Sequence, residues 1–346
     1  MEQRNISAVL IAKDEQALIR RCIRSLAGVD EVVVLDTGSK DRTAEVAREA
    51  GARVFPTDPV VPFHFAEARN RATAHAAHPW VLSIDADEVL RAGSLRKLRK
   101  AIADADEKTT AFSTLFVNRP EGGDRSIAIH KIKVFRKDAW TWKYRVHEQL
   151  MATRPAAIAL LGSVVIEHLP EPDKARRHGQ NIELLKLCIQ ENPEYARAFR
   201  HLGQELMLRK EWDEAVPHLL AYLEKTDEGP IEISYTFANV GECRASAGQL
   251  DEALGWFNRS GEAHPDRREP LLQAALWLIK SCRLDEALVW IGRMLAIPAS
   301  RRPFSNLDLP RAWSGEPLRM LTFCREEIAR AKAAWEAQQK TEASGT

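Results

Sequence analysis

The sequence is poor in cysteine and lacks a long hydrophobic run. Its five cysteines are scattered, odd in number and free of Cys-x-x-Cys spacing, which argues for reduced thiols and against a structural zinc site. The longest apolar stretch, residues 156–166, is much shorter than the roughly 20 residues that a membrane-spanning helix needs. The N-terminus carries no basic segment leading into a signal-length apolar core. We therefore expect a soluble, cytoplasmic protein without a membrane span.

An excess of charge of one sign is also absent. Lys and Arg number 50 and Asp and Glu 49, so the net charge is only +1. No field of the whole molecule would draw it to nucleic acid or to an anionic membrane. Its 346 residues are enough for two domains with separate cores.

Two kinds of pattern divide the chain. Residues 6–166 alternate short β-type runs with amphipathic helical stretches, which is typical of βαβ units and a mainly parallel sheet. From about residue 181 the β-type runs disappear and helix formers dominate. We expect an α/β domain over residues 1–172, a helical domain over residues 173–340 and a disordered tail over residues 341–346.

The helical half repeats itself. The segments WDEA at 212–215, LDEA at 250–253 and LDEA at 284–287 are spaced by 38 and 34 residues. Three small residues, Gly203, Gly241 and Ala275, recur at the same two intervals. Small residues allow the two helices of a pair to approach closely, and coupled landmarks at a period of about 34 residues resemble the tetratricopeptide repeat. The alternative is a generic helical bundle. Stacked helix pairs would present a concave surface to a partner, and could also join copies of the chain.

Carboxylates follow two of the expected strands. Asp36 comes directly after the run 32–35, and Asp85 and Asp87 come shortly after the apolar run 80–82. Ligands of parallel sheets bind at the carboxyl ends of the strands, and carboxylate oxygens are the ligands that Mg²⁺ and Mn²⁺ prefer. The sequence thus predicts a ligand site with a divalent cation at this edge. Helix capping by Asp36 and Asp41, or by Asp87 with Glu88 in the first turn, is the alternative.

Four segments in a fixed order closely resemble family 2 glycosyltransferases of the nucleotide-diphospho-sugar type. They are ISAVLIAKDEQALIRRCIRSL, VVVLDTGSKDRT, FAEARNRA and VLSIDADEVL. The resemblance covers about the first half of the chain. It implies a GT-A sandwich around a mainly parallel sheet, followed here by the all-α repeat array. It also implies an enzyme that takes a sugar from a nucleotide-diphospho-sugar, UDP-linked by expectation, with Mn²⁺ or Mg²⁺.

The same resemblance assigns residues to the donor site. Asp85-Ala86-Asp87 stands where the family has its DxD element. The implied nucleotide-sugar contacts are Ala12, Glu15, Asp36, Arg69, Asp85 and Ala86, and the implied metal ligands are Asp85, Asp87 and His168. Asp14 departs from the Lys-Asn-Glu that relatives commonly carry after the first strand.

A Val-His-Glu element at 146–148 resembles the acceptor side of relatives that carry the repeat array. An inverting transfer needs a general base that takes the proton of the acceptor. Glu148 is assigned this role, with His147 as the second choice because its ordinary pKa of about 6.5 suits proton transfer near neutrality. A purely structural role for both residues is the alternative.

The acceptor is the least constrained part of the prediction. Residues 125–145 contain seven Lys or Arg and one acid, interleaved with aromatic residues. Such a segment could bind a phosphorylated saccharide or a nucleic acid. The alternative is an amphipathic hairpin whose aromatic side chains lie in the core and whose lysines face water. Because relatives with this repeat type often modify peptides, a polypeptide acceptor ranks first, a saccharide second and a modified nucleic-acid base third. A catalytically dead transferase that serves as a repeat-based scaffold is the alternative of another class.

Overall fold

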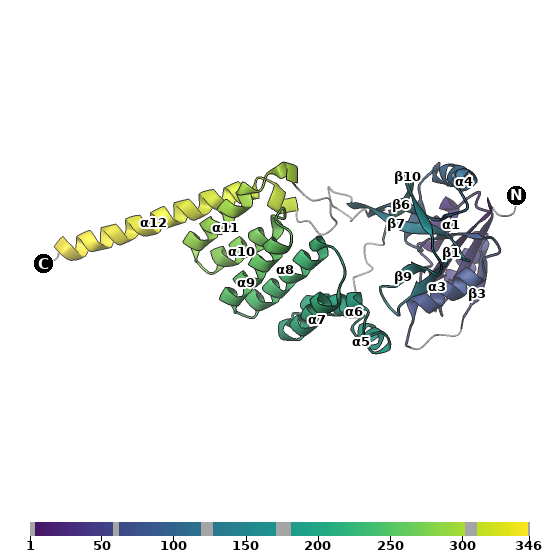
Figure 1. The fold of residues 1–346 in the computed structure, drawn as a ribbon, viewed down its shortest axis with the longest axis horizontal. Coiled ribbons are helices and arrows are strands. Elements are labelled where there is room, and N and C mark those ends of the chain that lie inside the picture. The colour runs from purple at the N-terminus through teal and green to yellow at the C-terminus, as the bar shows by residue number, and fades with distance from the viewer. Residues whose placement is uncertain (1–3, 58–61, 119–126, 171–180, 302–309, 345–346) are drawn as a thin grey trace. The chain divides into compact units, whose positions relative to one another are not determined.

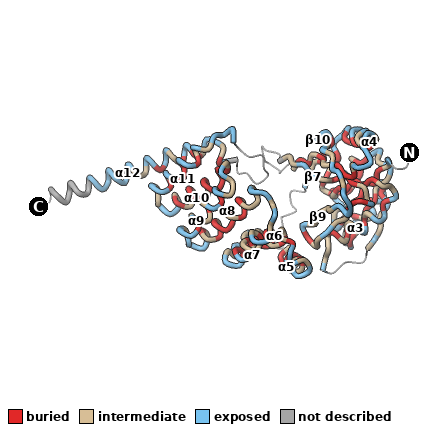
Figure 2. Tube along the Cα trace, viewed as in Figure 1, coloured by how far each residue is buried: buried red, intermediate tan, exposed pale blue. Residues whose placement is uncertain are grey.

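The structure, a computed structural model, describes residues 4–57, 62–118, 127–170, 181–301 and 310–344. The chain divides into two compact units, residues 1–177 and 178–346 (Figure 1). The domain boundary expected at residues 172 and 173 lies outside the described residues. Each unit has its own core, which Figure 2 shows as separate groups of buried segments.

The first unit is built on one eight-stranded sheet and a two-stranded hairpin. The strand order in the large sheet is β3-β2-β1-β4-β7-β6-β10-β5, and β8 pairs only with β9. Strands β3, β2, β1 and β4 run parallel to one another, and β6 is parallel to β10. Strand β7 is antiparallel to its neighbours β4 and β6, and β5 is antiparallel to β10. The strands are β1 (Ile6–Ala12), β2 (Glu31–Asp36), β3 (Arg53–Pro56), β4 (Trp80–Ser83), β5 (Glu88–Leu90), β6 (Thr109–Asn118), β7 (Ile127–Arg136), β8 (Trp140–Lys143), β9 (Gln149–Ala152) and β10 (Ala157–His168).

Helices cover both faces of this sheet. The core on one face includes residues of α1 (Ile19–Ser25), α2 (Thr43–Glu49) and α4 (Ser94–Asp104). The core on the other face includes residues of α3 (Phe65–Ala74) and of the β8–β9 hairpin. Six of the seven residues of β1 are buried, as expected for a continuous apolar strand that is covered on both sides. The predicted α/β sandwich with a mainly parallel sheet is confirmed.

The second unit is a series of antiparallel helix pairs. Their helices are α5 (Ile182–Glu191), α6 (Ala196–Leu208), α7 (Trp212–Lys225), α8 (Pro230–Ser246), α9 (Leu250–Ala263), α10 (Glu269–Lys280) and α11 (Leu284–Ala296). A Cβ added at Gly203 would lie 2.7 Å from Leu219, and one at Gly241 would lie 2.8 Å from Phe257. The small residues therefore set the close approach of α6 to α7 and of α8 to α9, and the helical unit fits the predicted tetratricopeptide array.

The chain after α11 continues with two short 3-10 helices, residues 299–301 and 310–313, and the long helix α12 (Glu316–Ser344). Residues 341–344 of the expected tail are helical, and residues 345–346 lie outside the described part. In the described part of the chain, no helix has the length and apolar character needed to cross a bilayer.

Candidate active site

The carboxyl ends of β1 and β2 bring two of the predicted residues side by side. Ala12 and Asp36 are partners in the parallel register. Asp36 Oδ1 accepts hydrogen bonds from the amides of Gly38 at 3.1 Å and Ser39 at 2.8 Å. One oxygen of Asp36 thus holds the turn after β2. The capping alternative applies to Asp41, which accepts a hydrogen bond from the amide of Thr43 at the start of α2.

Two backbone loops at this edge are tied together. Asp14 has a left-handed backbone with φ 56°, a conformation that Asp and Asn tolerate better than most residues. Its amide donates to Ser39 Oγ at 3.0 Å, and its Oδ1 accepts from the amide of Lys40 at 2.7 Å. The amide of Glu15 donates to Thr43 Oγ1 at 2.7 Å. Asp14 and Glu15 therefore join the loop after β1 to the loop after β2.

Arg69 connects the predicted DxD element to the predicted base. Its Nη1 lies 2.9 Å from Asp85 Oδ1, and its Nε donates to Glu148 Oε1 at 2.6 Å. The Arg69 and Glu148 side chains are only 13% and 14% exposed, so little solvent screens the pair. Burial alone would raise the pKa of Asp85, but the charges of Arg69 and Lys133 outweigh it and hold this pKa well below its usual range. The structure thus brings Arg69, Asp85 and Glu148 together and favours the ionised form of Asp85.

A buried ion pair that the sequence did not suggest lies next to Asp85. Glu88, the first residue of β5, accepts hydrogen bonds from Lys133 Nζ at 2.7 and 2.8 Å. It also accepts one from the amide of Asp85 at 3.0 Å. Lys133 Nζ is 3.7 Å from Asp85 Oδ2, so both Asp85 oxygens face a cation. The Glu88 side chain is 4% exposed, and removal of Lys133 would leave Glu88 as an uncompensated buried charge.

Asp87 lies in a second group, with His168 and Asn118. His168 Nε2 is 3.1 Å from Asp87 Oδ2, and His168 Nδ1 is 2.9 Å from Asn118 Oδ1. Strand register explains the grouping, because His168 pairs with Asn118 on β6 and with Glu88 on β5. A strand rather than a helix follows Asp87, and α4 begins only at Ser94, so the alternative in which Asp87 caps a helix is not what the structure contains.

The Val-His-Glu element occupies the loop of the β8–β9 hairpin. Asn70, the neighbour of Arg69 on α3, binds both the amide and the carbonyl of Trp142 at 2.9 Å and so acts like a paired strand. His147 is exposed and has a φ of 52°, whereas Glu148 turns toward Arg69. Asn70 thus binds the backbone of the hairpin, and Arg69 binds Glu148, the predicted base in the hairpin loop.

The basic segment 125–145 does not form one surface in its described part, which begins at residue 127. Arg136 pairs with Asp138, Lys137 donates to the carbonyl of Ala76 and Arg145 donates to the carbonyl of Pro62. Only Lys131 and Lys133 lie at the candidate site, where Lys131 Nζ is 3.8 Å from the centre of the Phe116 ring. The hairpin alternative explains the buried aromatics, but it does not explain the burial of Lys133.

The possible metal ligands of the site fit a cation that is held by few protein side chains. Across the described ranges, no group of three or more His, Cys, Asp or Glu side chains is arranged to hold a metal ion. The pair of Asp87 and His168 instead offers one oxygen and one nitrogen at a spacing of 3.1 Å. Mg²⁺ in nucleotide enzymes is commonly bound by one or two carboxylates together with substrate phosphates. A two-ligand site therefore suits an ion that arrives with a diphosphate.

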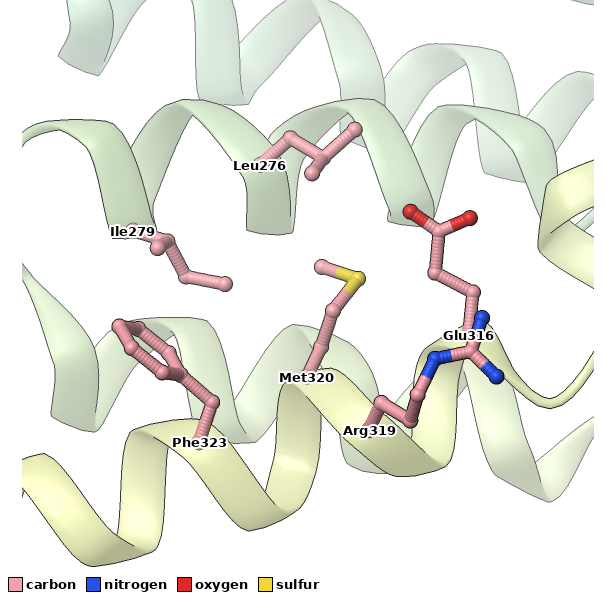
Figure 3. Close-up of a pocket in the computed structure, with 6 residues that line it drawn as sticks. All are labelled: Leu276, Ile279, Glu316, Arg319, Met320 and Phe323. Carbon is pink, nitrogen blue, oxygen red and sulfur yellow. The ribbon is translucent and has the colours of Figure 1, made fainter.

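A separate hollow lies in the helical unit, between α10 and α12. Figure 3 shows its lining, in which apolar side chains predominate and a single acid and a single arginine sit at one end; the residues are Leu276, Ile279, Glu316, Arg319, Met320 and Phe323. Ligand sites for polar molecules need several convergent polar groups. The sheet edge of the first unit is thus the better candidate for an active site.

A family model and several curated relatives match parts of the chain. Residues 7–157 match the profile of glycosyl transferase family 2. A TPR repeat-containing protein of Synechococcus elongatus is 39% identical over 132 residues, which are 34% of this chain and 32% of the relative. An uncharacterised glycosyltransferase of Rickettsia felis is 40% identical over 87 residues, 25% of this chain and 29% of the relative. The chain thus spans about a third of the length of these curated relatives.

Two further similarities concern proteins with more specific names. The lipopolysaccharide core biosynthesis glycosyltransferase LpsC of Rhizobium meliloti is 33% identical over 106 residues, 30% of this chain and 38% of the relative. Glucosyl-3-phosphoglycerate synthase of Mycobacterium tuberculosis, solved with Mn²⁺, UDP and its product, is 31% identical over 33% of this chain and 44% of that one, with a TM-score of 0.29. On the family match, the first unit contains a glycosyltransferase domain of family 2.

Proposed function

We propose that the first unit is the catalytic domain of a metal-dependent, inverting glycosyltransferase that uses a UDP-linked sugar and modifies a polypeptide. One observation carries the proposal: the family 2 domain gathers charged side chains around the carboxyl end of β4. They are the carboxylates of Asp85, Asp87, Glu88 and Glu148 and the cations of Arg69, Lys131 and Lys133. Because the carboxylates outnumber the cations, this cluster of side chains attracts a positive ion. A bound cation would in turn allow the cluster to bind a diphosphate.

The residues proposed to hold the divalent ion are Asp87 and His168. Bound there, Mn²⁺ or Mg²⁺ would offset the negative charge that develops on the diphosphate as the glycosidic bond breaks. Asp85, also predicted as a metal ligand, faces Arg69 and Lys133 on its two oxygens, and we propose for it a contact to the nucleotide sugar. Ala86, which is buried between the two aspartates, would line the same contact.

Arg69 is proposed to bind a phosphate of the donor. A guanidinium pairs with phosphate in the same bidentate manner as with carboxylate, and two carboxylates already fix the orientation of Arg69. Ala12, Glu15 and Asp36 are proposed nucleoside contacts, which the register of β1 with β2 and the tied loops support.

Glu148 is proposed as the general base. Its carboxylate accepts a hydrogen bond from Arg69 Nε, and this contact supports a base close to the proposed phosphate-binding residue. An inverting transfer requires the base to take the acceptor proton as the acceptor oxygen attacks the sugar from the face opposite the diphosphate. His147, exposed in the same loop, is the second candidate.

The polypeptide acceptor is supported by the helical repeats, since stacked repeats generally bind extended partners on their concave surface. A saccharide is the second candidate, and the likeness to an enzyme named for lipopolysaccharide core biosynthesis favours it. A nucleic-acid acceptor gains no support from the basic segment, because most of its described cations bind carbonyls or acids of their own domain.

Donor hydrolysis separates an enzyme from a scaffold. Full-length protein with Mn²⁺ should slowly release nucleoside diphosphate from one member of a panel of UDP-, GDP- and dTDP-sugars without any acceptor, because water replaces the acceptor at an assembled site. EDTA should stop the release. If no donor in the panel is hydrolysed and none raises the melting temperature, the scaffold alternative replaces the proposed enzyme.

A further inference from the structure

Asn118 contacts the one histidine that the proposed function gives to the metal ion. Asn118 Oδ1 lies 2.9 Å from His168 Nδ1, on the side of the ring opposite to Asp87. Phe116, two residues earlier on β6 and hence on the same face of the strand, stacks on the His168 ring with centroids 5.9 Å apart and planes at 28°. Together the two side chains of β6 fix the plane of the ring and the direction of both its nitrogens.

The chemistry of these contacts determines where the proton of a neutral ring lies. An amide oxygen only accepts hydrogen bonds, so Nδ1 is the donor in the orientation that the structure gives the Asn118 amide, with Oδ1 2.9 Å away. A neutral imidazole carries a single N–H, and Nε2 is then left with its lone pair directed at Asp87 Oδ2, 3.1 Å away. Two electron-pair donors at this distance repel each other unless a cation lies between them, and this is how two ligands of one metal ion face each other.

We propose that Asn118 is a positioning residue that keeps the proton of His168 on Nδ1 and so reserves Nε2 for the divalent ion. The inference rests on the proposed function, in which Asp87 and His168 hold that ion. Histidine ligands of metals usually donate their other N–H to an oxygen, and loss of such a partner typically lowers metal affinity by about 10- to 100-fold. Asn118 provides this oxygen.

The first test observes the proton itself. Nitrogen NMR of the metal-free, full-length protein labelled with ¹⁵N-histidine distinguishes the two neutral tautomers, and the His168→Gln variant assigns the signal. We expect His168 to carry its proton on Nδ1 in the wild type. A proton on Nε2 would make the Asp87 contact an ordinary hydrogen bond, with the Asn118 amide reversed, and would overturn the inference without touching the proposed function.

The second test compares two replacements of Asn118. Asn118→Asp keeps an oxygen acceptor and has no N–H, so the Nδ1–H tautomer and Mn²⁺ binding should persist. Asn118→Leu removes the acceptor, so the proton should move to Nε2 and Mn²⁺ affinity in the presence of UDP, measured by EPR of the free ion, should fall by about 10- to 100-fold. Wild-type Mn²⁺ affinity in Asn118→Leu with UDP would contradict the role of Asn118. A wild type that shows the Nδ1–H tautomer but binds no Mn²⁺ even with UDP would instead overturn the metal site of the proposed function, and the purpose assigned to Asn118 with it.

Discussion

Replacing Glu148 with glutamine is expected to lower Mn²⁺-dependent donor hydrolysis by about 10²- to 10⁴-fold, the range typical of a lost general base. Glutamine keeps an oxygen that can accept the hydrogen bond from Arg69 Nε, so the guanidinium should stay in place and donor affinity should change little. The rate of nucleoside diphosphate release and the affinity for UDP, measured on the same preparation, separate a loss of chemistry from a loss of binding.

The matched control is His147→Asn. Asparagine tolerates the left-handed backbone that His147 adopts at φ 52°, so this change removes the imidazole with little strain. If the asparagine variant loses hydrolysis while Glu148→Gln retains it, His147 is the base and Glu148 only holds Arg69. Full activity in both variants would leave the hairpin loop with a structural role.

Lys133→Met is expected to destabilise the first unit by about 3–5 kcal/mol, the usual cost of breaking a buried ion pair from one side. Methionine is close to the length of lysine and fills the same space, so the effect comes from charge. Glu88, 4% exposed, would be left without its cation, and Asp85 would lose one of its two. Hydrogen–deuterium exchange of peptides from β5 and β7 reports the stability of this unit separately from that of the helical unit.

The double variant Lys133→Met/Glu88→Leu is the control for this prediction. Removing both charges restores an apolar contact, and such replacements are often neutral or stabilising. Exchange rates in the double variant should return most of the way toward the wild type. Equal destabilisation in the single and double variants would mean that packing, and not the ion pair, explains the burial of Lys133.

Local sequence patterns were sufficient to predict the two-domain fold. The apolar run of β1 and the acid at the end of β2 predict a sheet covered on both faces with a polar edge, and the structure has both. In the helical half, Gly203 and Gly241 face Leu219 and Phe257 at distances that permit no Cβ, which is the packing expected from their spacing.

The site was only partly predictable, because its contacts depend on register between strands far apart in sequence. Asp85, Asp87 and Arg69 carry recognisable motifs, but nothing local shows that Lys133 meets Glu88 across 45 residues or that Asn118 meets His168 across 50. The one local indication that Lys133 is buried is its position in an apolar strand. The same position is equally consistent with a solvated lysine side chain. The bond from Asn70 to the backbone of Trp142 likewise needs the three-dimensional placement of α3 against the hairpin.

We propose that Asp87 and His168 hold a divalent ion through which the first unit binds a nucleotide diphosphate. Calorimetric titration of UDP into wild-type protein and into Asp87→Ala, each with Mn²⁺ and with EDTA, tests this role. Asp87 is partly exposed at a strand end, so the alanine variant should stay folded. We predict binding by the wild type with Mn²⁺, little or none with EDTA, and little or none by Asp87→Ala under either condition. Equal UDP affinity in Asp87→Ala and wild type with Mn²⁺ would contradict the claim.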